Sequence, residues 1–178
     1  MKKCSIIYFI FIISLIFPIS AHAQSVKNAV RALEKLETRC ESSISYLDYS
    51  IAVANAKLPV NFYLESSESS MNESLTASIK KAMSHYEFVE SAWRDAIANG
   101  GTPTPFSEGM ELEIIGRYPM TDKSISEGGA RQNDRILMKE KVFAIIWEAA
   151  SGELKKTTLL LDKEGSKMAP KRGLGIEF

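Results

Sequence analysis

The sequence predicts an α+β fold, in which an N-terminal hairpin of two long antiparallel helices packs on a small antiparallel β-sheet of three to four strands. Two observations lead to this prediction. Apolar residues recur at three- and four-residue spacing in the first half of the chain, but they alternate or form short runs in the second half. The proline-containing stretch TPTPF, residues 102–106, separates the two patterns and reads as an extended linker.

The N-terminal segment predicts export. Lys2 and Lys3 precede thirteen almost wholly apolar residues, 5–17, and a small-x-small site ends at Ala23. This order is typical of a secretory signal peptide, whereas a membrane-spanning anchor needs about 20 apolar residues. We therefore expect cleavage after Ala23 and a periplasmic or secreted bacterial protein, which is not integral to the membrane after cleavage.

The mature chain has the size of one ordinary domain. Removing the leader, 1–23, from 178 residues leaves 155, residues 24–178, which suffice for a hydrophobic core. Residues 24–101 are expected to form the helical hairpin and 102–178 the sheet region. The chain has 22 basic and 22 acidic residues, and the leader removes two lysines, so the mature net charge of −2 argues against nucleic-acid binding.

The first long helix is expected between Ser25, a good N-cap, and Leu58, because Pro59 disfavours its continuation. Two rows of residues in steps of seven, four residues apart, mark one face of this helix. The first row is Val26, Leu33, Cys40, Leu47 and Ala54, and the second is Val30, Glu37, Ile44, Ile51 and Leu58. Only Glu37 breaks the apolar pattern.

The second long helix is expected to begin at the capping box SMNE, residues 70–73, and to end at Asn99-Gly100-Gly101, where the glycines suit a left-handed cap. Its apolar seam is Leu75, Ile79, Ala82, Tyr86, Val89, Trp93 and Ala96. We expect the two helices to pair within the chain and form a core. The alternative is a dimeric coiled coil, so the protein is predicted to be a monomer or a homodimer through the helices.

Strands are expected in the C-terminal half. Residues 110–118 alternate apolar and acidic side chains, and residues 135–149 include an apolar stretch that suits a central strand. A turn at 151–153 would return the chain as an antiparallel strand, 154–162. Residues 173–178 would add a short edge strand.

Two connections are candidates for partner binding. The loop 119–134 is long and polar, and basic side chains near it suit a carboxylate or phosphate. The hairpin tip, 59–67, carries apolar side chains that would add to the sheet, cap the helices or stand exposed to a partner. The candidate residues are Phe62, Tyr63 and Leu64 at the tip, and Arg117, Asp122, Lys123, Arg131 and Arg135 around the loop.

The mature chain carries no motif of a metal, cofactor or catalytic site. With one histidine and one cysteine after the leader, it lacks the usual zinc framework, and no calcium loop, phosphate-binding glycine loop or G-x-S-x-G elbow occurs. Paired carboxylates are expected at the surface rather than in a glycosidase-type site. These pairs are Glu111 with Glu113 and Glu87 with Glu90.

The lone mature cysteine raises the question of a nucleophile. Antiparallel helices would bring Cys40 within about one turn of His85, so a Cys–His contact is conceivable. Cys40 falls in the row of Leu33 and Leu47, however, where an apolar environment keeps a thiol protonated and inert. We therefore interpret Cys40 as a packing residue that forms no disulfide within the chain.

These features favour a non-enzymatic periplasmic binding or assembly protein, for example an accessory component of a secretion or pilus apparatus. Its partner would be another envelope protein, and no cofactor is expected. The alternative hypothesis is a periplasmic inhibitor or immunity protein that blocks a toxin or hydrolase by inserting the 119–134 loop. An enzyme that uses carboxylates ranks last.

Overall fold

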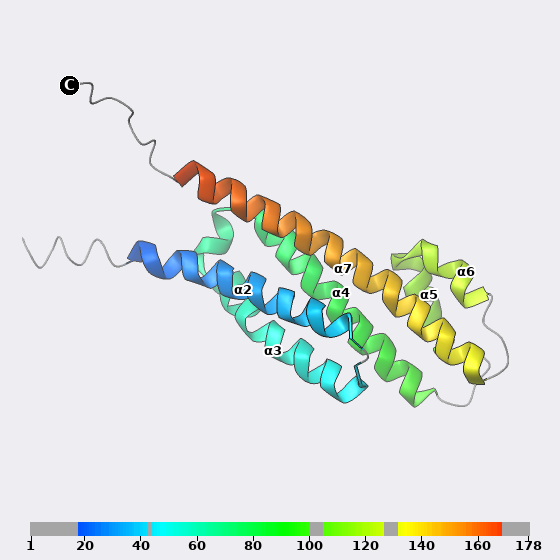
Figure 1. Cartoon of the computed structure of the whole chain (residues 1–178). Coiled ribbons are helices and arrows are strands. Elements are labelled where there is room, and N and C mark those ends of the chain that lie inside the picture. The colour runs from blue at the N-terminus through cyan, green and yellow to red at the C-terminus, as the bar shows by residue number, and fades with distance from the viewer. Residues whose placement is uncertain (1–17, 43, 100–104, 127–131, 169–178) are drawn as a thin grey trace, which may run out of the picture.

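The chain folds as an up-and-down bundle of four long helices (Figure 1). The computed structural model describes residues 18–42, 44–99, 105–126 and 132–168. The four helices of the bundle are α2 (Pro18–Cys40), α3 (Tyr46–Glu65), α4 (Glu73–Ala98) and α7 (Gln132–Met168). Shorter elements connect them: η1 (Ser67–Ser70), α5 (Glu108–Arg117), η2 (Pro119–Thr121) and α6 (Asp122–Ser126).

Each long helix packs against two neighbours, so the four form a closed square. α2 and α4 both contact α3 on one side and α7 on the other. Their buried side chains belong to one hydrophobic core, which contains several large aromatic residues. The largest fully buried ones are Tyr49, Tyr63, Tyr86, Phe106 and Phe143. Removing this apolar surface from water is the main stabilising term of such a bundle.

The predicted α+β fold is wrong, because no strand occurs in the four described segments. Residues predicted as the first strand, 110–118, lie mostly in α5. The predicted strands 135–149 and 154–162, together with the turn between them, lie within the single helix α7. The predicted edge strand 173–178 lies outside the described residues.

The spacing of the buried residues explains why these segments are helical. In α7 the buried positions follow each other at helical intervals: Met138, Val142, Phe143, Ile146, Ala150, Leu154 and Thr157. In α5, Ile114 is buried and Leu112 is exposed, which is not the alternation that a half-buried strand requires. Ser107 caps α5, because its hydroxyl accepts a hydrogen bond from the Met110 amide at 3.3 Å.

The predicted first helix is in fact two antiparallel helices. α2 ends at Cys40, and Ser45 starts α3 as its N-cap, with its hydroxyl accepting from the Asp48 amide at 3.2 Å. Pro59 does not end α3 but lies inside it, and the helix continues to Glu65. The chain reverses direction between α2 and α3, so the inward face of α3 differs from the one that the steps of seven predict.

α4 matches the predicted second helix more closely. The seam from Leu75 to Val89 is buried, and Trp93 and Ala96 pack against the core. The N-cap is Asn72 rather than Ser70: its side chain accepts from the Leu75 amide at 3.0 Å. The C-cap Asn99 is not left-handed, with φ of −88°, and the predicted glycines at 100–101 lie outside the described residues.

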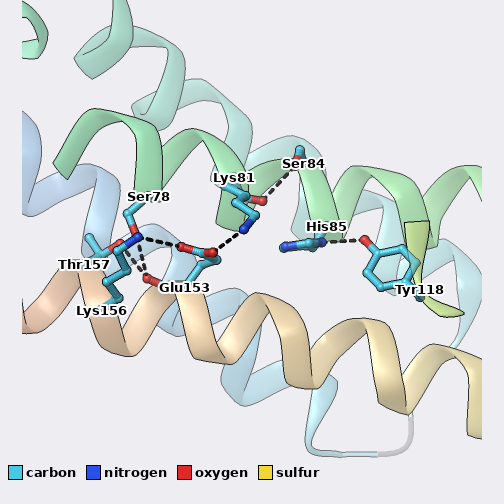
Figure 2. A network of polar contacts seen from close by, with 8 residues as sticks. All are labelled: Ser78, Lys81, Ser84, His85, Tyr118, Glu153, Lys156 and Thr157. Carbon is cyan, nitrogen blue, oxygen red and sulfur yellow. Dashed lines mark hydrogen bonds and ion pairs between the residues drawn. The ribbon is translucent and has the colours of Figure 1, made fainter. Parts of the chain in front are cut away.

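Polar contacts tie α4 to α7 and to the α5–η2 segment (Figure 2). Glu153 of α7 accepts a hydrogen bond from Ser78 at 3.0 Å and forms an ion pair with Lys81 at 2.6 Å. Hydrogen bonding to Lys81 is the main cause that lowers the pKa of Glu153. Further along α4, His85 Nδ1 lies 2.5 Å from the Tyr118 hydroxyl. These contacts fix α7 and the chain after α5 against α4.

In the part of the chain that the structure describes, no helix combines the length and the apolar character needed to cross a bilayer.

Candidate functional site

The outer face of α3 is an exposed apolar stripe. Leu47, Ile51, Leu58 and Phe62 are exposed by 68%, 52%, 61% and 65%, and Ala54 between them is also exposed. These four are among only nine large apolar side chains that are exposed in the described segments, so they gather on one helix rather than scatter. We call the five residues the α3 face.

The helical repeat puts these side chains on one side. At 3.6 residues per turn, Leu47, Ile51, Leu58 and Phe62 point within about 60° of one another. The opposite side of α3 carries the buried residues Tyr49, Ala52, Val53, Ala56, Val60 and Tyr63. α3 is therefore apolar on two opposite sides, whereas a surface helix normally presents a polar face to water.

A basic groove borders the α3 face on the side of α2. Arg31, Lys35 and Arg39 recur every fourth residue along α2 and line a cavity of about 580 Å³ between α2 and α3. Ala52 and Pro59 of α3 form part of its opposite wall. Among the described residues no ion pair neutralises the three cations, so the groove presents positive charge.

Along the other border of the α3 face, towards α4, the charged side chains are paired. Lys57 forms an ion pair with Glu87 of α4 at 2.6 Å, and Ser50 donates to Glu90 at 2.8 Å. Glu90 also pairs with Arg94 at 3.1 Å. Unpaired positive charge therefore flanks the α3 face only along α2, in the part of the chain that the structure describes.

The three predicted partner-binding residues of the hairpin tip divide between surface and core. Phe62 belongs to the α3 face. Tyr63 is fully buried, and its hydroxyl lies 2.8 Å from the Thr76 hydroxyl, while Leu64 is partly buried against the core. Only Phe62 is therefore placed to meet a partner.

The structure does not bring the residues around the predicted loop to the α3 face. Arg117 lies in α5, where it pairs with Glu113 at 2.6 Å and stacks 4.4 Å from the ring centroid of Phe88. Asp122 and Lys123 are exposed in α6. α5 and α6 lie towards the end of the bundle where α7 begins, whereas the C-terminal end of α3, to which Phe62 belongs, lies towards the other end (Figure 1).

The last two predicted loop residues cannot be placed as side chains. Arg131 lies outside the described residues, and Arg135 lies in α7 with its side chain undescribed. Residues 119–126 form η2 and α6, which corrects the expectation of one irregular loop over 119–134.

Cys40 and His85 do not form a catalytic pair. His85 bonds Tyr118, and burial lowers the pKa of His85, helped by the positive charge of Lys81. Cys40 is partly buried, and burial followed by the charges of Glu37 and Glu41 raises the pKa of its thiol to about 12. A thiol with so high a pKa is a poor nucleophile at neutral pH.

Three of the four predicted paired carboxylates are engaged with cations, whereas Glu111 is partly buried and its Oε1 has no hydrogen-bond partner among the described residues. Glu87, Glu90 and Glu113 each take part in an ion pair. Across the described segments, no three His, Cys, Asp or Glu side chains gather closely enough to hold a metal ion.

Comparison with known proteins finds no similarity that assigns a family. No family model, no curated protein and no solved structure matches the chain.

The basic row on α2 is the part of the site that the sequence interpretation missed. Arg31, Lys35 and Arg39 stand at positions i, i+4 and i+8, which places them on one side of a helix. That spacing in the sequence alone indicates a row of basic side chains along one side of a helix. The basic row lies beside an apolar face only because the chain reverses between α2 and α3. The continuous pattern of sevens did not predict that reversal.

Proposed function

We propose that this chain is a non-enzymatic, exported binding protein of the bacterial envelope, and that the α3 face docks an amphipathic helix of another envelope protein. A role as an accessory component of a secretion or pilus apparatus fits this activity. The observation that carries the proposal is the α3 face itself. An exposed apolar patch of this kind is typical of protein interaction sites.

The flanking charge defines the partner's chemistry. An amphipathic helix lying along α3 would place its apolar side chains on Leu47, Ile51, Leu58 and Phe62. Its polar flank would then face the basic groove, where acidic side chains meet Arg31, Lys35 and Arg39. Charge complementarity of this type mainly raises the association rate and selects the partner.

The inhibitor alternative has less support. It requires an inserting loop at 119–134, but residues 119–126 are helical and no contact of the described part of that segment indicates a target. We therefore keep one proposal.

A binding experiment with a defined probe tests the α3 face. The probe is a fluorescein-labelled helical peptide with a Leu/Ile stripe flanked by Glu, and its anisotropy is measured against the mature chain. Changing Leu58→Ser together with Phe62→Ser is expected to weaken binding at least about tenfold, because burial of each large side chain contributes about 1.5–3 kcal/mol. Arg31→Gln with Arg39→Gln should reduce both the affinity and its dependence on salt.

Leu159→Ser is the matched control, since Leu159 is 63% exposed on α7 and lies outside the α3 face. It should bind as the unchanged chain does, and circular dichroism should show equal helicity for all variants. Equal affinity of the Leu58/Phe62 variant would refute the proposal. A stable dimer of the unchanged chain that the Leu58/Phe62 variant dissociates would also refute the proposal, because a second copy of the chain would then cover the α3 face. Binding to anionic vesicles but not to the peptide would instead indicate a membrane surface.

A further inference from the structure

Two adjoining cavities lie on another part of the bundle, between α2, α4 and α7. We call the smaller one, of about 250 Å³ and lined in part by the buried Tyr86, the inner cavity, and the larger one, of about 460 Å³, the outer cavity. Cys40, Glu41 and Trp147 line both, so the two cavities lie side by side, and we call the pair the Cys40 cleft. It shares no lining residue with the α3 face or the basic groove.

Carboxylates dominate the charge of the Cys40 cleft. Glu37, Glu41 and Glu148 line the inner cavity, and Glu140 joins Glu41 in the outer one. Among the described residues, Lys139 is the one cation that lines either cavity. Glu140 and Glu148 are eight residues apart on α7, which separates them by about 12 Å along the helix axis. The negative charge therefore extends along the cleft and does not converge on one point.

Aromatic rings form the apolar part of the wall. Trp93, Phe143 and Trp147 line the outer cavity, with ring centroids 5.2 Å apart for Trp93 and Phe143 and 6.0 Å apart for Phe143 and Trp147. Lys139 Nζ lies 5.2 Å from the centroid of Trp93. An ammonium group thus already occupies one aromatic face, as expected from the attraction between cations and indole rings.

Tyr86, whose buried hydroxyl is unsatisfied in the described segments, is one of the residues that line the inner cavity. Tyr86 is only 1% exposed, and its hydroxyl has no hydrogen-bond partner among the described residues. Burial raises the pKa of Tyr86, and the negative charges of Glu37 and Glu41 raise it further. A buried polar group without a partner costs about 1–3 kcal/mol, and a ligand N–H would supply that partner.

We propose that the Cys40 cleft binds an elongated organic cation of the polyamine class. Its ammonium groups meet the carboxylates of Glu37, Glu41, Glu140 and Glu148, and donate to the Tyr86 hydroxyl at the inner end. Its methylene segments lie against the rings of Trp93 and Trp147. This binding is separate from the α3 face and does not depend on it.

Tryptophan fluorescence tests the proposal directly. The chain has two tryptophans, Trp93 and Trp147, and both line the cleft, so the emission reports from this place alone. Titrating the mature chain with spermidine at low salt should give a saturable change in emission. Glu41→Gln with Glu148→Gln should weaken binding about tenfold, since two partly exposed charge pairs are lost. Lys139→Gln should strengthen binding, because it removes the competing cation.

Glu34→Gln is the matched control, as Glu34 is exposed on α2 and lines neither cavity of the cleft. It should bind spermidine as the unchanged chain does. Tyr86→Phe should lower the affinity while leaving the unliganded fold at least as stable. The proposal is overturned if no saturable change occurs, if the Glu41/Glu148 variant binds equally well, or if MgCl₂ at the same concentration reproduces the change.

Discussion

Cys40 shows how its surroundings, rather than the residue type, decide the chemistry of a side chain. It stands in the last turn of α2, where burial and the neighbouring carboxylates of Glu37 and Glu41 raise the pKa of its thiol to about 12. The protonated thiol acts as a small apolar wall of the Cys40 cleft. The sequence interpretation of Cys40 as a packing residue agrees with this environment, although the side chain is only partly buried.

His85 predicts a pH dependence of stability. Burial and the charges of Lys81 and Arg117 lower its pKa, and only Glu153 opposes this shift, while His85 Nδ1 and the Tyr118 hydroxyl share a hydrogen bond. The unfolded chain, with a His pKa of about 6.5, therefore takes up a proton more readily than the folded one. The free energy of unfolding should be highest above pH 6.5 and should fall as the pH decreases through the folded-state pKa.

Urea unfolding between pH 7.5 and 5.5 measures this effect. His85→Gln should reduce the fall in stability over that range, because glutamine does not titrate. Ser84→Ala, at an exposed neighbouring position, should keep the wild-type slope. The lowered pKa of Glu153 acts in the same direction but at more acidic pH, so it does not obscure the comparison. An unchanged slope in the His85 variant would mean that another group titrates.

At the scale of the helix, Ser45 provides a test of the break between α2 and α3. Its hydroxyl accepts from the Asp48 amide and donates to the Asp48 carboxylate at 2.6 Å. Ser45→Ala should therefore destabilise the protein by about 1 kcal/mol, the usual cost of a lost N-cap. In one continuous helix Ser45 would be an interior residue, and alanine there would stabilise. The sign of the change in unfolding free energy thus distinguishes the two arrangements.

Ser42→Ala is the control for this measurement. Ser42 lies in the same turn, but its hydroxyl only donates to the Arg39 carbonyl and caps no helix. Its substitution should change stability by less than about 0.5 kcal/mol.

The sequence predicted the α4 seam and the inner row of α2 because each of these helices has one apolar side. α3 has two, and the rows of sevens ran through its outer residues Leu47 and Ile51 instead of its buried residues Tyr49 and Val53. In α7, the apolar stretch from Val142 to Trp147 suggested a central strand. The partner helices of the bundle override such local preference, since they cover the buried row of α7.

For the whole molecule, the closed square of helices separates the two proposed sites. The α3 face points outward from one corner, whereas the Cys40 cleft is lined by residues of α2, α4 and α7. A helical partner and an organic cation would therefore bind without competing for a side chain. Of the predicted site residues whose side chains the structure describes, only Phe62 belongs to either site, because the others were chosen on an expected strand, loop and hairpin tip that are helical in the structure.

The proposed export of the protein has a consequence for the bundle. α2 starts at Pro18, so cleavage after Ala23 would remove its first residues, but the described core begins later, at Val26. A chain that starts at Gln24 should therefore keep the helical content and the cooperative unfolding of the bundle. A chain that starts at Glu34 loses the buried Val26, Val30 and Leu33 and should be destabilised by several kcal/mol, as for other losses of large core side chains. Circular dichroism and urea unfolding of the two truncated chains measure the difference.

N-terminal sequencing of the protein from the producing cells tests the cleavage itself: Gln24, or its cyclised form, is the expected first residue. A protein that retains Met1 in a membrane fraction would rule out the exported, cleaved form and with it the envelope partner proposed for the α3 face.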